Sequence, residues 1–351
     1  MTSSGGVSGR TWGVRRSLIA TAALLVATCG VGVVIRGQTA WESYKTRQGP
    51  PSVDRHLTDP ALIGAVDLHA HHDPDSYPRQ SDAFEIARLM KDRGLRGMVL
   101  KNHWTETAGL AYLVRRYATP DMEVFGALSL DTPVGGMNPQ AVRYLADVTG
   151  HLGRIVWMPT HDSEHEVTYL KENRPFVPVS RGGKLLPETL DVIAVIAKSD
   201  LALATGHVSP DEAMMILREA KRAGVQRLIV THPLLGPQFT DLTADQMVEA
   251  SKLGAYIEIV SGNLTRPGQT RTRTVEAIRR IGPEMCFVSS DSGLAGGANH
   301  TDSLALAAKA LRDAGFRESD LNRMFKENPA RLVKLPIQAS TTASNSRGPN
   351  R

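Results

Sequence analysis

Short apolar runs alternate with stretches of helical periodicity over most of the chain. Eight of these runs have the length and composition of buried strands, and they lie at residues 63–69, 95–101, 123–130, 154–160, 201–207, 227–232, 255–261 and 285–291. Repeated alternation of strands and helices produces parallel strands, and eight of them favour a closed (β/α)8 TIM barrel. The alternative is a doubly wound open sheet, but no glycine-rich phosphate loop follows the first strand.

Start and stop signals for helices support this division. Ser209 can cap a helix that Gly224 closes, and Pro210 suits its first turn. Signals of the same kind predict further helices at residues 81–94, 243–254, 302–315 and 319–333.

The two ends of the chain depart from this alternation. Arg15 and Arg16 precede an uncharged apolar run at 18–35, and the arginine pair resembles a twin-arginine export signal. The run is also near the lower limit for a membrane-spanning helix. We therefore expect an exported protein, periplasmic or extracellular, or one anchored in the membrane through this segment. The predicted division is a signal peptide or membrane anchor at 1–40, a linker at 41–60, the barrel at 61–335 and a disordered tail at 336–351.

Charge and cysteine content narrow the classes of partner. The first 40 residues hold four arginines and no acid, so they account for most of the net charge of +5. The rest of the chain has no basic arm or stripe, and we expect no nucleic-acid partner and no membrane contact beyond the N-terminal segment. The two cysteines exclude a disulfide framework and a cysteine-based zinc site. The sequence leaves the oligomeric state open.

Side chains of metal-binding type gather at the ends of the predicted strands. His69 and His71 share one face of the first strand, because side chains alternate along a strand, and together they can bind one metal ion. Other predicted strands end in Lys101 and His103, His161, His207, His232 and Asp291. In a barrel these ends meet at one mouth, where barrel enzymes hold their active sites. The sequence therefore predicts a metal centre at that mouth.

This arrangement resembles the amidohydrolase superfamily of metal-dependent hydrolases. The resemblance spans residues 62–335 and rests on the histidine pair of the first strand, the histidines of the fifth and sixth strands and the aspartate of the eighth. Residues 328–332 also look like the closing helix of the superfamily. Within it, the chain is most similar to a branch without an assigned reaction.

The resemblance implies a ligand set for one or two divalent ions. His69, His71 and Asp291 would hold one ion, and His207 and His232 a second. Histidine and carboxylate ligands suit Zn²⁺, with Mn²⁺ or Fe²⁺ as alternatives.

A bridging ligand is expected from Lys101. Binuclear members of the superfamily often use a carboxylated lysine from the fourth strand, but here that strand offers His161 and no lysine. Lys101, at the end of the second strand, is the substitute that the chain provides. The alternative is a lysine at the rim that reaches solvent or binds substrate.

The resemblance further implies hydrolysis of an amide, lactone or ester bond in a small molecule by metal-activated water. Asp291 would act as general base, and His232 or His161 would polarise the scissile group. One alternative is a decarboxylase or hydratase with a single metal, in which Lys101 binds a substrate carboxylate. Another is a non-catalytic exported binding protein.

Three loops are expected to select the substrate, at 131–140, 162–186 and 262–270. The second carries Arg174 and Arg181, which are candidates for contact with an anionic substrate group or for a solvated surface.

Overall fold

The computed structural model describes residues 54–76 and 78–337. The predicted signal or anchor segment at 1–40, most of the linker and most of the tail lie outside the described residues. Within the described ranges, no helix is both long and apolar enough to cross a membrane.

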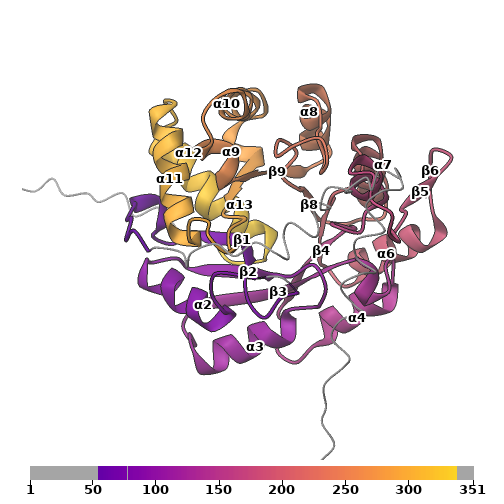
Figure 1. The fold of residues 1–351 in the computed structure, drawn as a ribbon, viewed down its shortest axis with the longest axis horizontal. Helices are drawn as coiled ribbons and strands as arrows, with labels where there is room; N and C mark the ends of the chain where they lie inside the picture. The colour runs from indigo at the N-terminus through magenta and orange to yellow at the C-terminus, as the bar shows by residue number, and fades with distance from the viewer. Residues whose placement is uncertain (1–53, 77, 338–351) are drawn as a thin grey trace, which may run out of the picture. The chain divides into compact units, whose positions relative to one another are not determined.

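Eight parallel strands form one sheet whose spatial order follows the sequence (Figure 1). They are β1 (Val66–His71), β2 (Gly97–Lys101), β3 (Glu123–Ser129), β4 (Gly153–Trp157), β7 (Ala202–Ala204), β8 (Arg227–Val230), β9 (Ala255–Val260) and β10 (Cys286–Ser289). Two backbone hydrogen bonds join the first strand to the chain just after the last. The Asp291 N–H donates to the His69 carbonyl at 3.0 Å, and the His71 N–H donates to the Ser292 carbonyl at 3.1 Å. The predicted TIM barrel is confirmed.

Helices connect the strands and surround the barrel. The longer ones are α2 (Ala83–Asp92), α3 (Ala108–Tyr117), α4 (Pro139–Asp147), α6 (Pro187–Lys198), α7 (Pro210–Arg222), α8 (Ala244–Lys252), α10 (Gln269–Ile281) and α11 (His300–Asp313). Shorter segments are α5 (Glu164–Tyr169), α9 (Ser261–Thr265), α12 (Glu318–Asn322) and α13 (Asn328–Leu332), with 3-10 turns at Pro60–Leu62, Thr132–Val134 and Pro283–Met285. Ser209 and Thr243 cap α7 and α8 as predicted, each accepting a hydrogen bond from the third helical N–H.

The strands were visible in the sequence because they are buried on both faces. Every residue of β1, β2, β7 and β10 is buried, so β2, β7 and β10 read as mostly apolar runs, whereas every second residue of β1 is polar. Where polar residues interrupt such a run, they therefore stand out.

Three elements differ from the prediction. The first strand begins at Val66 instead of residue 63, because a 3-10 turn at Pro60–Leu62 and Gly64, with φ of 80°, delay it. The final helix, predicted as continuous over 319–333, is interrupted by a π-helical segment at Arg323–Glu327. A hairpin of two-residue strands, β5 (Ser180–Arg181) and β6 (Lys184–Leu185), occupies part of a predicted loop.

Candidate metal centre

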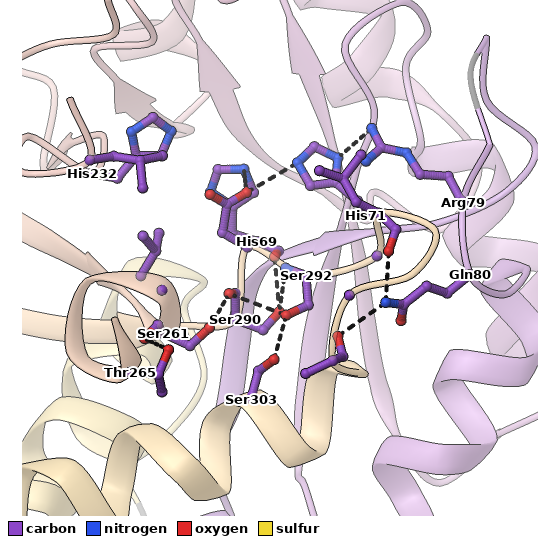
Figure 2. Close-up of a pocket in the computed structure, with 18 of the residues that line it drawn as sticks. His69, His71, Arg79, Gln80, His232, Ser261, Thr265, Ser290, Ser292 and Ser303 are labelled. Atoms are coloured by element: carbon purple, nitrogen blue, oxygen red, sulfur yellow. Dashed lines mark hydrogen bonds and ion pairs between the residues drawn. The ribbon is translucent and has the colours of Figure 1, made fainter. Parts of the chain in front are cut away.

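Six histidines from five strand ends surround one pocket of about 560 Å³. Their rings form a closed circuit, which we call the histidine ring, in the order His69, His71, His103, His161, His207 and His232. Neighbouring ring centroids are 4.2 to 5.7 Å apart. Figure 2 shows three of these side chains, His69, His71 and His232, above the loop that follows β10. The barrel thus brings together all the histidines that the sequence placed at strand ends.

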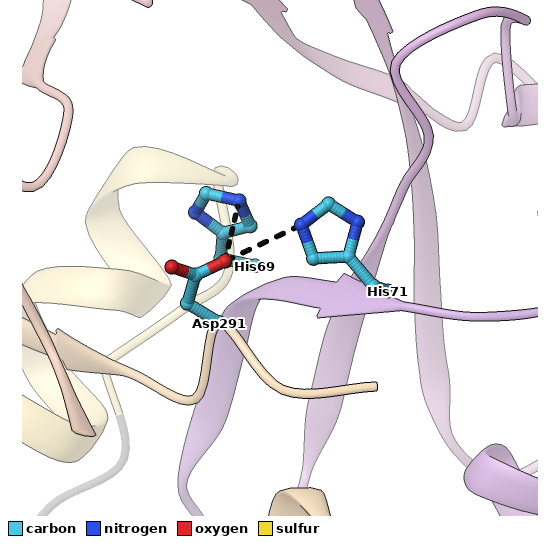
Figure 3. A group of neighbouring side chains, drawn as sticks. All are labelled: His69, His71 and Asp291. Atoms are coloured by element: carbon cyan, nitrogen blue, oxygen red, sulfur yellow. Dashed lines mark ion pairs between the residues drawn. The ribbon is translucent and has the colours of Figure 1, made fainter. Parts of the chain in front are cut away.

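The best-formed group within this ring consists of His69, His71 and Asp291 (Figure 3). Asp291 Oδ1 lies 3.3 Å from His69 Nε2 and 3.3 Å from His71 Nε2. Ligand atoms about 2.0 Å from a tetrahedral zinc ion are separated from one another by about 3.3 Å. The donor atoms of this group therefore have the spacing and the chemistry of a divalent metal site.

Glu258 holds His69 from the opposite side of its ring. The carboxylate accepts a hydrogen bond from His69 Nδ1 at 2.9 Å and one from the Ser289 hydroxyl at 2.7 Å. With the proton on Nδ1, the Nε2 lone pair is free for a metal ion. Burial lowers the pKa of His69 to about 3, so the imidazole is neutral at pH 7.

His71 is held differently. Arg79 Nη2 lies 3.1 Å from its Nδ1, and Arg79 is itself paired with Asp75 at 2.7 Å. Both side chains of that pair are buried. Burial and the charge of Arg79 lower the pKa of His71 well below its usual value. Because a guanidinium can only donate, His71 Nδ1 accepts this hydrogen bond, and the neutral ring carries its proton on Nε2, where a bound metal ion would displace it.

A second group consists of His161, Glu166 and His207. The two oxygens of Glu166 lie 2.8 Å from His161 Nδ1 and 2.6 Å from His207 Nδ1. These separations are shorter than the edge of a zinc coordination sphere and correspond to hydrogen bonds. Glu166 therefore fixes both rings through Nδ1 and leaves each Nε2 for another ligand.

The charges within this second group oppose the effect of burial. Burial alone would raise the pKa of Glu166, but the two imidazoles lower it to about 2. Burial would likewise lower the pKa of His161, but Glu166 raises it above its usual value. Burial lowers the pKa of His207 to about 3, and Glu166 only partly opposes this.

His103 is linked to a carboxylate through a hydroxyl. Its Nδ1 lies 2.7 Å from Thr160 Oγ1, and that hydroxyl donates to Asp131. Asp131 also accepts from the Thr160 N–H at 2.8 Å. This chain puts the His103 proton on Nδ1, so His103 presents an Nε2 lone pair in the same way as His69 and His207.

His232 and Asp291 have backbone conformations that are rare for residues with a side chain. Their φ angles are 22° and 48°. His232 Nδ1 is buried and has no hydrogen-bond partner among the described residues. Burial lowers the pKa of His232 to about 3. An unpartnered neutral imidazole on a strained backbone is consistent with a ligand-binding role.

Lys101 is fully buried and does not line the pocket. Its Cα is the register partner of His71, its Nζ lies 4.7 Å from the centroid of the Trp157 ring, and Nζ has no hydrogen-bond partner among the described residues. Burial lowers the pKa of Lys101 to about 8, although nearby carboxylates oppose the shift. The alternative of a rim lysine that reaches solvent is wrong, because the side chain is fully buried.

The supporting carboxylates Glu258 and Glu166 were not predicted. Glu258 left a signal, because it is a single acid inside the apolar strand at 255–260 and its burial requires partners. Glu166 left none, since it resembles the neighbouring Glu164 in a short helix after β4.

The loops contribute differently from expectation. No pocket-lining residue comes from 131–140 or 162–186, whereas Gly262, Thr265 and Arg266 line the pocket from the third loop. Arg174 instead pairs with Asp162 and with Glu172.

Comparison with known sequences identifies one family. The model of a family of unknown function (DUF6282) matches residues 64–258. No curated protein matches the chain in sequence.

Solved structures with the same fold have little sequence identity. An amidohydrolase from Burkholderia multivorans with bound zinc gives a TM-score of 0.53 at 14% identity, covering 78% of this chain and 99% of its own. Organophosphorus hydrolase from Deinococcus radiodurans gives 0.52 at 15% identity, covering 78% and 93%. N-acetyl-D-glucosamine-6-phosphate deacetylase from Mycobacterium smegmatis gives 0.52 at 19%, covering 78% and 77%. The predicted resemblance to the amidohydrolase superfamily is confirmed at the level of the fold.

Proposed function

Because this chain belongs to DUF6282, a family of unknown function, its activity has to be inferred from its site, and we propose that it is a metal-dependent hydrolase. The substrate in this proposal is a small molecule with an amide, lactone or ester bond. The fold and the histidine-rich site support a metal-dependent enzyme of the amidohydrolase type.

One observation carries the proposal, the triangle of His69 Nε2, His71 Nε2 and Asp291 Oδ1. The two 3.3 Å separations between Asp291 Oδ1 and the imidazole nitrogens match the spacing of ligand atoms around a divalent metal. A zinc ion held there supplies a Lewis acid that activates water at neutral pH. His207 and His232 are proposed to hold a second ion.

Asp291 is placed to receive a proton at the pocket. Its side chain is 20% exposed, and burial raises its pKa although His69 opposes the shift. A carboxylate with a raised pKa is a better proton acceptor than an ordinary aspartate. We assign it the role of general base. His232 and His161 line the same pocket and are proposed to polarise the scissile group.

Lys101 is proposed as the carboxylated, bridging ligand. Carboxylation requires the neutral amine, and a pKa of about 8 leaves roughly a tenth of the amine neutral at pH 7. A fully buried Nζ without a hydrogen-bond partner would gain partners as a carbamate.

The test is the metal content of the purified full-length chain, beside His69→Ala and Lys101→Met. We expect about two ions per chain, and fewer in both variants, because each variant removes a proposed ligand. The exposed His151 provides a matched control, and His151→Ala should leave the content unchanged. Absence of bound metal in the unmodified chain would sink the proposal.

A single-metal lyase is the second candidate. It is favoured by the observation that Glu166, in the second group, lies at hydrogen-bond distance from His161 and His207, whereas the first group has the wider spacing of metal ligands. One ion per chain, unaffected by Lys101→Met, would support decarboxylation or hydration over a binuclear hydrolase.

A further inference from the structure

The charged side chains that line the pocket are Asp291, Arg79 and Arg266. Arg79 is buried and paired with Asp75, so its charge is already compensated. Arg266 is exposed, and its side chain makes no ion pair or hydrogen bond with any residue that the structure describes. Among the cations of the pocket lining, Arg266 is therefore the one whose charge no described residue compensates.

The backbone that carries Arg266 is fixed. The Arg266 N–H donates to the Gly262 carbonyl at 3.2 Å and closes the short helix α9. The Asn263 side chain ties this helix to the Leu234 carbonyl at 2.9 Å, and the Ser261 hydroxyl ties it to the Ser290 carbonyl at 2.6 Å. Figure 2 shows Ser261 next to Ser290 in this wall of the pocket. A cation on an anchored segment is held near the pocket before any ligand arrives.

Other cations near the mouth are not available in this way. Arg174 pairs with Asp162 and Glu172, and Arg181 lies on the β5–β6 hairpin, outside the pocket lining. The two arginines that the sequence singled out therefore do not line the pocket.

Part of the lining of the same pocket is apolar. Leu235, Phe239 and Val260 line the pocket, and the Phe239 ring packs edge-on against His207 and His232, with centroids 4.8 and 5.4 Å away. A ligand at the histidine ring can therefore place a hydrophobic body against Phe239.

We propose that the substrate carries an anionic group, a carboxylate or a phosphate, which Arg266 binds at the rim while an apolar body packs against Leu235 and Phe239. This inference rests on the proposed function, because it names the substrate class of the same site. Arg266 then determines specificity, since a guanidinium forms paired hydrogen bonds with carboxylate and phosphate groups.

The test measures binding of 4-phenylbutyrate, its neutral amide 4-phenylbutyramide and phenyl phosphate by calorimetry at pH 7.5. The full-length chain, with and without added zinc, is compared with Arg266→Gln. Arg88→Gln is the matched control, because Arg88 is an exposed arginine outside the pocket lining. We expect Arg266→Gln to weaken binding of an anion about tenfold and of the amide less than twofold, with Arg88→Gln like the unmodified chain. If 4-phenylbutyrate binds more tightly than phenyl phosphate, the anionic group of the substrate is a carboxylate, and in the opposite case it is a phosphate.

Equal affinity of the unmodified chain for the acid and the amide would overturn the inference. The inference would also be overturned if the Arg266→Gln variant bound both anions as tightly as the unmodified chain. If the chain takes up metal but its binding of the anions does not depend on Arg266, this inference fails and the proposed function stands. Arg266-dependent binding in a chain that takes up no metal overturns the proposed function alone.

Discussion

At the scale of residues, burial keeps an unusual number of histidines neutral. It lowers the pKa of His69, His71, His72, His103, His207, His232 and His300. In the unfolded chain these groups titrate near 6.5. Below that pH the unfolded state binds protons that the folded state does not, so the metal-free protein loses stability as the pH falls from about 6.5 towards 3.

His232→Asn should reduce this acid sensitivity. With a folded-state pKa of about 3, His232 alone accounts for a loss of about 2 kcal/mol between pH 7 and pH 5. The check is the difference in unfolding free energy between those two pH values, from urea titration of the metal-free chains. The variant should lose about 2 kcal/mol less than the unmodified chain. An equal loss in both would show that His232 is protonated in the folded state.

The residues that the sequence revealed are those that interrupt an apolar strand or follow it directly. His69, His71 and Asp291 were found for this reason, and the structure brings them together. Glu166 could not be found, because only the closed barrel brings His207, from the end of β7, beside the segment after β4 that carries His161 and Glu166. The assignment of each side chain as a metal ligand stays a prediction.

At the scale of elements, the close approach of β4 and the turn after β7 holds the second group together. Gly206, immediately before His207, has φ of 65°, and a Cβ there would lie 2.3 Å from the Met158 carbonyl oxygen and 2.5 Å from that of Pro159. These carbonyls belong to the segment that leads to His161. Only glycine permits the two segments to lie this close.

Gly206→Ala should therefore destabilise the protein by about 3 kcal/mol or more, from overpacking added to the strain of positive φ. Gly224, with φ of 89° and open space around its Cβ position, is the control. Gly224→Ala should cost about 1 kcal/mol from backbone strain alone. Urea unfolding of both variants measures the difference. Equal costs would mean that the turn after β7 relaxes without strain.

Elements were predicted well where they are buried on both faces and less well where they are short. All eight barrel strands were found, whereas the β5–β6 hairpin was missed because two-residue strands carry no periodicity. The start of β1 was misplaced because Ile63, although apolar, lies before the strand and is 62% exposed.

At the scale of the whole molecule, a metal that binds only the folded barrel stabilises it by mass action. Zinc at one hundred times its dissociation constant contributes about 2.7 kcal/mol. For a chain of this size we expect the melting temperature to rise by about 5 °C. Asp291→Asn should abolish most of this shift, because it removes the anionic ligand of the first group. Thermal unfolding followed by fluorescence checks both chains, and an equal shift in each would place the ion elsewhere.

The overall architecture followed from the number and order of elements alone. The N-terminal 1–40 segment lies outside the described residues, so export or membrane anchoring stays a prediction that cell fractionation can test.

The contact between the first strand and the chain after the last strand also sets the order in which the site is assembled. His69 and Ser290 are 221 residues apart, yet the Ser290 hydroxyl and the Asp291 N–H both reach the His69 carbonyl. During synthesis on the ribosome, His69 and His71 emerge long before Asp291. A partly made or truncated chain therefore holds the two histidines without the aspartate, and the proposed metal centre is complete only after the last strand has docked.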